Sequence, residues 1–164
     1  MTQCEALLKE HFGYDLPSAP APAAAYVPYV ISGSLIFISG QLPRLGDLSV
    51  EGAISDSDED IAKGQHAAQI CAVNILAQCK AALATQGLSL DHVSKVVRLG
   101  GFVNTAAGMS KQPLVINGAS ELMNNVFENG RGAHARAAVS ASALPFNVSV
   151  EIEAVIEFSS QPCC

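Results

Sequence analysis

A stripe of apolar side chains over residues 58–86 constrains the fold of this chain more than any other feature. Its members recur at spacings of three, four and seven residues, which is the period of one face of an α-helix. They are Ile61, Ala68, Ala72, Ile75, Cys79 and Ala82. Acidic residues open the segment, where the helix dipole favours negative charge, and Gly87 follows it as a stop signal. We therefore expect a long helix that buries this stripe against a second layer.

The end of the chain supplies that layer, because residues 134–158 contain two runs with the period of a β-strand, joined by a short Leu-Pro turn. In the second run, apolar side chains alternate with a mostly polar set that includes Glu151 and Glu153. The first run consists of small residues headed by Arg136. The pattern predicts one sheet face under helices and a second, small and polar face that carries Arg136 together with the carboxylates.

The remaining segments give the order of the elements. A short helix ends at Gly13, a Pro- and Ala-rich arm covers residues 16–28, and two apolar runs over residues 29–43 indicate a hairpin. A strand at residues 92–105 and a helix at residues 112–130 complete the series. We expect an α+β fold with a mainly antiparallel sheet and two helices on one face. The expected division is an extension at residues 1–21, one domain at residues 22–158 and a tail at residues 159–164.

Composition bears on partners and on the compartment. The chain is 49% apolar and only 15% charged, which predicts a homo-oligomer that hides surface against its own copies. A net charge of −6 and scattered cations disfavour nucleic acid. The sequence shows no export signal and no run that predicts a membrane span, so we expect a cytoplasmic protein. Five cysteines form no disulfide framework, and we expect Cys71 and Cys79 to be buried free thiols.

Arg136 is the main candidate for ligand binding. A planar guanidinium among small neighbours can hold a carboxylate through two hydrogen bonds, and a nearby carboxylate can orient a water or move a proton. The competing interpretation is a wet face whose charges only aid solubility. Arg131, between two glycines, is expected to be an exposed loop cation, whereas His134 fits either a proton carrier or a residue packed between subunits.

Four segments together resemble the Rid family of reactive intermediate deaminases, also known as YjgF-type or liver perchloric-acid-soluble proteins. They are "SGQLP" (residues 39–43), "RLGGFVN" (98–104), "NGASELMNNVF" (117–127) and "HARAAVSASALPFNVSVEIEAVIEF" (134–158). The resemblance runs from about residue 22 to residue 158. It implies a chorismate-mutase-like α+β fold, a homotrimer with ligand clefts between neighbouring subunits, and no metal or organic cofactor.

The resemblance also assigns roles to particular residues. Arg136 matches the family's carboxylate-binding arginine, and Glu151 matches the glutamate that positions the hydrolytic water. Further ligand contacts map to Tyr29, Gly40, Asn117 and Ala138. The implied reaction converts 2-enamino or 2-imino acids into 2-keto acids and ammonia.

The sequence departs from the family pattern at several points. Many active members carry cysteine where this chain has Ala138, the N-terminal arm is longer, and an insertion lies within residues 124–136. Two alternatives therefore remain open: a non-catalytic binder or chaperone that holds a small carboxylate in the same cleft, and an endoribonuclease that inhibits translation.

Overall fold

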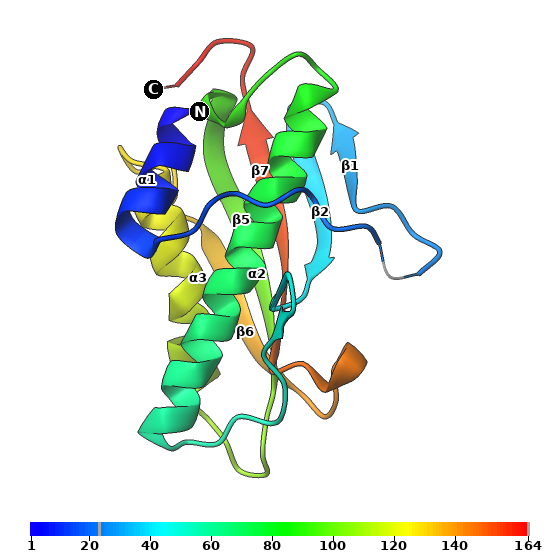
Figure 1. Ribbon diagram of the computed structural model, residues 1–164, viewed down its shortest axis with the longest axis vertical. Helices are drawn as coiled ribbons and strands as arrows, with labels where there is room; N and C mark the ends of the chain where they lie inside the picture. Colours follow the sequence, from blue (N-terminus) through cyan, green and yellow to red (C-terminus); the bar gives the residue numbers. More distant parts are fainter. Residues whose placement is uncertain (23, 164) are drawn as a thin grey trace.

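The computed structural model describes residues 1–22 and 24–163, and its centre is a five-stranded sheet with helices on one face (Figure 1). Ala23 of the expected arm and Cys164 of the expected tail lie outside the described residues. In spatial order the strands are β1 (Tyr29–Ser32), β2 (Leu35–Gln41), β7 (Val150–Phe158), β5 (Val93–Asn104) and β6 (Ala135–Ala141). The pairs β1–β2, β2–β7 and β7–β5 are antiparallel, whereas β5 and β6 are parallel. The expected α+β fold class is confirmed.

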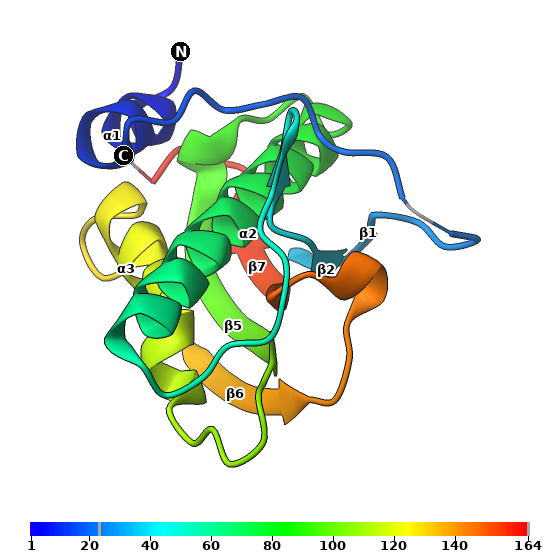
Figure 2. The ribbon, with the colours of Figure 1, turned by 60° about the horizontal axis from the view of Figure 1, so that its bottom comes forward.

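Two helices, α2 (Asp58–Ala84) and α3 (Gln112–Val126), pack against one face of this sheet, as expected. A third helix, α1 (Gln3–Phe12), packs against α3, beside which Figure 2 shows it. The short elements are β3 (Arg44–Leu45), β4 (Leu48–Ser49), and the 3₁₀ turns η1 (Leu90–His92) and η2 (Pro145–Asn147). We call the opposite side of the sheet the open face, because no helix among the described residues covers it.

The long helix α2 forms where the apolar stripe predicts it. The Ser57 side chain caps its first turn by accepting from the backbone N–H of Asp60, and Gly87 adopts a left-handed φ of 71° after its last turn. All six members of the predicted stripe are buried. By length and composition α2 could also cross a membrane, but 78% of its most apolar stretch is buried inside the protein. The helix is therefore the core helix of the domain.

The last two strands are arranged differently from the expectation. They are not neighbours, because β5 lies between β7 and β6. The reason is the connection through α3: the chain leaves β5, forms the helix over the sheet, and returns parallel to β5 as β6. The Leu-Pro turn at η2 then carries the chain across β5 to reach β7.

Two predictions about single residues have opposite outcomes. Cys71 and Cys79 are buried free thiols as expected, and burial raises the pKa of both. The prediction for Arg131 is wrong, because its side chain is buried rather than exposed in a loop. Its guanidinium donates to the carbonyl oxygens of Val93 and Glu128 and lies 5.8 Å from the ring centre of Phe127. Arg131 therefore anchors the turn that follows α3.

Close packing of α2 against α3 requires a glycine at position 118. A Cβ there would overlap the backbone oxygen of Gln65 on α2. Glycine to alanine inside a helix normally stabilises by about 0.5–1 kcal/mol. We expect Gly118→Ala to lower the free energy of unfolding instead, by about 1–3 kcal/mol, because backbone cannot yield as a side chain can. Urea unfolding at fixed protein concentration measures this, with Glu121→Ala on the exposed side of α3 as the control; a stabilised Gly118→Ala would contradict it.

Candidate active site

Glu151 lies on the open face of β7, directly over Gly40 of β2. A Cβ at position 40 would overlap a carboxylate oxygen of Glu151, so the missing side chain makes room for this carboxylate. Glu151 is half-buried, and its carboxylate accepts no hydrogen bond from any other residue that the structure describes. It lines a cavity of about 310 Å³ whose other walls are Ala24, Tyr26, Gly40, Leu42, Pro145 and Phe146. The geometry leaves the carboxylate available to a ligand or a water molecule.

The surroundings of Glu151 favour its protonated form. Burial raises the pKa of the Glu151 carboxyl, and the negative charge of Glu153, two residues along the same face, raises it further. Glu153 itself pairs with Arg98 of β5, whose Nη1 lies 2.9 Å from its Oε1. A carboxyl with a raised pKa is a better proton acceptor near neutral pH than an ordinary glutamate.

Arg136 is held against α3 by three hydrogen bonds. Its Nη1 donates to Oδ1 of Asn117 at 2.9 Å and to Oγ of Ser120 at 3.1 Å, and its Nη2 donates to the carbonyl oxygen of Pro113 at 3.3 Å. A guanidinium has five N–H groups. The two left over, on Nε and Nη2, have no partner among the described residues, and the side chain is exposed. Two free N–H groups on one guanidinium are what a bidentate carboxylate needs.

Arg136 and Glu151 lie on opposite faces of the sheet. Arg136 is level with Leu99 of β5, whose side chain is in the core, whereas Glu151 is level with Phe102. The expectation that Arg136 shares a face with the carboxylates is therefore wrong for a single chain. The parallel register of β6 turns Arg136 toward α3. Ala138 follows on the same side, packed against the core.

The tyrosine near Gly40 is Tyr26 rather than Tyr29. Tyr29 pairs with Ile38 and packs against the core on the helix side of the sheet, away from Glu151. Tyr26 lies in the arm three residues earlier and lines the cavity with Glu151 and Gly40. Of the residues named from the sequence, the structure thus brings Gly40 to Glu151 and Asn117 to Arg136.

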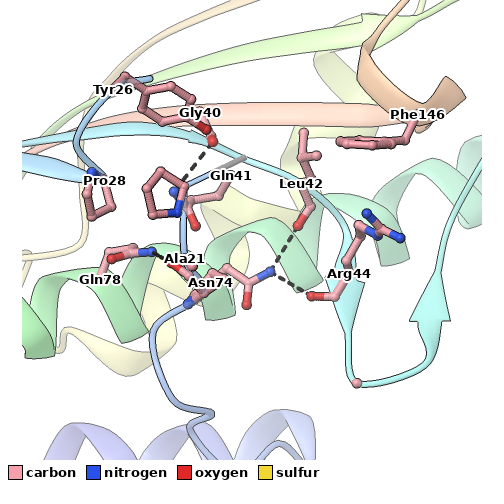
Figure 3. A pocket seen from close by; sticks show the side chains of 13 residues that line it. Ala21, Tyr26, Pro28, Gly40, Gln41, Leu42, Arg44, Asn74, Gln78 and Phe146 are labelled. Carbon is pink, nitrogen blue, oxygen red and sulfur yellow. Dashed lines mark hydrogen bonds between the residues drawn. The ribbon is translucent and has the colours of Figure 1, made fainter. Parts of the chain in front are cut away.

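A second cavity of about 330 Å³ lies beside the first, between the N-terminal arm, α2 and the segment after β2 (Figure 3). Two buried amides of α2 hold its walls together. The Asn74 side chain donates to the carbonyl oxygens of Leu42 and Arg44, and the Gln78 side chain donates to that of Pro20 in the arm. The ring of Phe146 borders both cavities. Gln78 therefore fixes the arm that brings Tyr26 to the site, and Asn74 fixes the segment after β2.

Sequence reasoning gave no role to Phe146 or Ser120. Phe146 has a φ of 55°, a left-handed conformation that is unusual for a bulky residue, and its side chain is 56% exposed. The guanidinium of Arg44 lies 5.0 Å from the centre of its ring. The sequence feature that indicates Phe146 is a bulky residue in the turn after "ALP". Ser120 lies one helical turn after Asn117, and this spacing predicts that the two side chains are neighbours.

Comparison with known proteins identifies the family of this chain. The family model described as Endoribonuclease L-PSP matches residues 16–158, which is most of the chain. The chain belongs to the L-PSP family. This family includes the YjgF-type and Rid proteins, so the resemblance seen in the sequence is confirmed.

Individual relatives and solved structures also match most of the chain. Protein TCP17 of Trypanosoma cruzi is 40% identical over 153 residues, covering 92% of each chain. The crystal structure of Atu1372 from Agrobacterium tumefaciens, a protein of unknown function, is 46% identical with a TM-score of 0.85, covering 96% of this chain and 93% of that one. E. coli TdcF, solved with bound serine, is 25% identical with a TM-score of 0.55, covering 86% of this L-PSP chain and 94% of its own.

Proposed function

We propose that this L-PSP protein hydrolyses reactive 2-enamino and 2-imino acids to 2-keto acids and ammonia, in clefts between the subunits of a cytoplasmic homotrimer. The observation that carries the proposal is the separation of its two functional groups. A tethered guanidinium with two free N–H groups and a half-buried carboxylate lie on opposite faces of one sheet. Arg136 of one copy can meet Glu151 of the next, whereas within one chain the two cannot share a ligand.

The open face supports assembly with further copies. It exposes large apolar side chains from several strands, which a monomer rarely leaves in water. These are Val30 (52% exposed), Phe37 (44%) and Val139 (45%). Of their three strands, β2 lies next to the Glu151 strand β7, whereas β1 and β6 form the two edges of the sheet. A copy that covers the whole face therefore also borders the cavity that Glu151 lines.

The reaction follows from the chemistry of the two groups. Arg136 binds the substrate carboxylate through its Nε–H and its remaining Nη2–H, which fixes the neighbouring imine carbon. A water molecule attacks the carbon of the protonated imine while Glu151 accepts one of its protons, and a neutral carbinolamine forms. Glu151 then gives that proton to the nitrogen and takes the hydroxyl proton as the C–N bond breaks, so that a 2-keto acid and ammonia leave; the last proton passes from Glu151 to ammonia. The serine bound by TdcF carries a carboxylate and a nitrogen on adjacent carbons, as a 2-imino acid does.

Trapping with semicarbazide tests this function. An amino-acid oxidase generates the 2-imino acid in place, and semicarbazide captures whatever the protein does not hydrolyse. We expect the wild type to lower the yield of the imine semicarbazone and Arg136→Gln to leave it unchanged. If the wild type never competes with semicarbazide, across small, branched and aromatic side chains, the hydrolase proposal fails.

A non-catalytic carboxylate binder is the second candidate, and one observation favours it. The Arg136 site is built from β6 and α3 alone and does not require Glu151. Such a binder would bind 2-keto acids even if the wild type does not lower the yield of the imine semicarbazone. The endoribonuclease activity in the family's name has less support, because the −6 charge and the pairing of Lys9, Lys80 and Arg98 with carboxylates leave no basic track along the described chain.

Phe146 is expected to select substrates with apolar side chains, since its ring borders the Glu151 cavity. Phe146→Ala should raise KM for a leucine-derived imine about tenfold and change the alanine-derived imine little. Phe146→Gly should raise KM for the leucine-derived imine in the same way. It should unfold at a higher urea concentration than Phe146→Ala, because glycine adopts the left-handed backbone without the cost of about 1–2 kcal/mol that alanine carries. The trapping assay measures the first effect and urea unfolding the second. Equal losses for both imines would contradict this role.

A further inference from the structure

A chain of hydrogen bonds links His134 to Arg136 through Ser120, and the reaction described above leaves two of these residues unused. Nε2 of His134 lies 2.9 Å from Oγ of Ser120, and that oxygen lies 3.1 Å from Nη1 of Arg136. His134 immediately precedes β6 and Arg136 is the second residue of that strand, while Ser120 lies in the middle of α3. The chain thus joins the edge strand to the helix at the guanidinium.

The partners of His134 determine which of its nitrogens carries the proton. Nδ1 lies 2.6 Å from the carbonyl oxygen of Gly132, which can only accept, so Nδ1 carries a hydrogen. In the neutral ring Nε2 is then an acceptor, and the Ser120 hydroxyl donates to it. A lone pair of Ser120 Oγ remains for the N–H of Arg136. All donors and acceptors in the chain are matched while His134 is neutral.

We propose that His134 is a positioning residue that acts on Arg136 through Ser120, and that the hold of Arg136 on a carboxylate tightens when His134 becomes protonated. This rests on the proposed function only in taking Arg136 as the carboxylate-binding group. Protonation makes Nε2 a donor, so Ser120 must accept from both neighbours and its own hydrogen turns away. The change places a second positive charge two hydrogen bonds from the guanidinium of Arg136 and three from the bound carboxylate.

The charges around His134 set the sign of this coupling. Burial lowers the pKa of His134, the positive charges of Arg136 on β6 and Lys95 on β5 lower it further, and the bond to the Gly132 carbonyl opposes them. From α3 the group that faces the ring is the uncharged Ser120 hydroxyl. A bound carboxylate neutralises part of the Arg136 charge and therefore raises the pKa of His134. By linkage, carboxylate affinity rises as the pH falls.

The test is titration calorimetry with pyruvate between pH 8 and pH 5 at constant ionic strength. Pyruvate stays ionised over this range, since α-carboxyl groups titrate well below it. All proteins carry Glu151→Gln, so that a second titrating carboxyl does not contribute. We expect the Kd to fall about fivefold from pH 8 to pH 5 with His134 present. His134→Gln, which can still accept from Ser120, should give a pH-independent Kd, and Ser120→Ala should bind more weakly with a shallower pH dependence.

A second readout needs no ligand. The ring proton signals of His134, assigned by their loss in His134→Gln, report its pKa by NMR, and Arg136→Gln should raise that pKa. A Kd that is flat with pH in the presence of His134, or a His134 titration that ignores Arg136→Gln, overturns the coupling while leaving the hydrolase proposal intact. Absence of pyruvate binding at every pH removes the Arg136 carboxylate site, and with it both proposals.

Discussion

Replacing Arg136 by glutamine is expected to lower kcat/KM for 2-imino acids by roughly 30-fold to several-thousand-fold. Losing one partner of a buried, hydrogen-bonded charge pair costs about 2–5 kcal/mol, and the substrate carboxylate would lose both of its donors. The Asn117 oxygen and the Pro113 carbonyl would also lose the N–H groups that they now accept from. Steady-state kinetics in the trapping assay gives the ratio, and calorimetry with pyruvate gives the matching loss of affinity.

Two further substitutions separate the geometry of Arg136 from its charge. Arg136→Lys keeps the charge but not the fork of two N–H groups, so we expect it to recover only a small part of the lost kcat/KM. Lys111→Gln removes a cation just before α3, where its Nζ donates to the carbonyl oxygen of Asp56. Its kcat/KM should stay within about twofold of the wild type, as for most surface substitutions. Equal losses in Lys111→Gln and Arg136→Gln would mean that net charge, rather than bidentate binding, controls the rate.

The buried face of a strand can be predicted from sequence only where apolar and polar side chains alternate clearly along it. Along β7, valine and isoleucine alternate with glutamate, so the side that meets the helices is unambiguous, and the structure has it as expected. Along β6, alanine occupies both sides, with one serine on one side and one valine on the other, and small side chains fit a covered face or an open one. The sequence of β6 alone therefore does not predict which face of the sheet Arg136 occupies. That face follows from the parallel register with β5, which the connection through α3 imposes.

The positions of Arg131 and Tyr29 both depend on contacts between segments that are distant in the sequence. An arginine between two glycines is usually exposed, but here β5 and the turn after α3 each supply a carbonyl oxygen for its guanidinium, and the ring of Phe127 lies beside it. Tyr29 and Tyr26 are three residues apart, and no local pattern distinguishes which one reaches Gly40. The start of β1 at Tyr29 decides it, because pairing with Ile38 turns Tyr29 toward the core. Long-range pairing, rather than local propensity, sets the side chains of this site.

Replacing Glu151 by glutamine is expected to lower kcat by roughly 10²–10⁴-fold while leaving the Kd for pyruvate unchanged or slightly lower. Glutamine has nearly the same shape as glutamate above Gly40 but cannot accept the proton. The substitution should therefore affect kcat without affecting ligand affinity. The matched control is Glu157→Gln, on the same face of β7, where the carboxylate accepts from Ser94 instead of lining the cavity. Equal losses of kcat in both variants would assign the effect to the charge of the open face.

The pH dependence provides a second test, because the pKa of Glu151 lies above its ordinary value. A base must be ionised, so wild-type kcat should fall as the pH drops through that raised pKa, and the residual activity of Glu151→Gln should lack this limb. The free energy of unfolding should change with pH in the opposite direction and rise as the pH drops. Folding disfavours the ionised carboxylate, so above the ordinary pKa of 4.5 the wild type carries a cost that is absent once the carboxyl is protonated. Glu151→Gln should therefore be more stable than the wild type at pH 7, and this advantage should vanish below pH 4.5. A catalytic carboxylate kept despite this cost of burial is expected to show both trends, whereas a solvated surface glutamate would show neither.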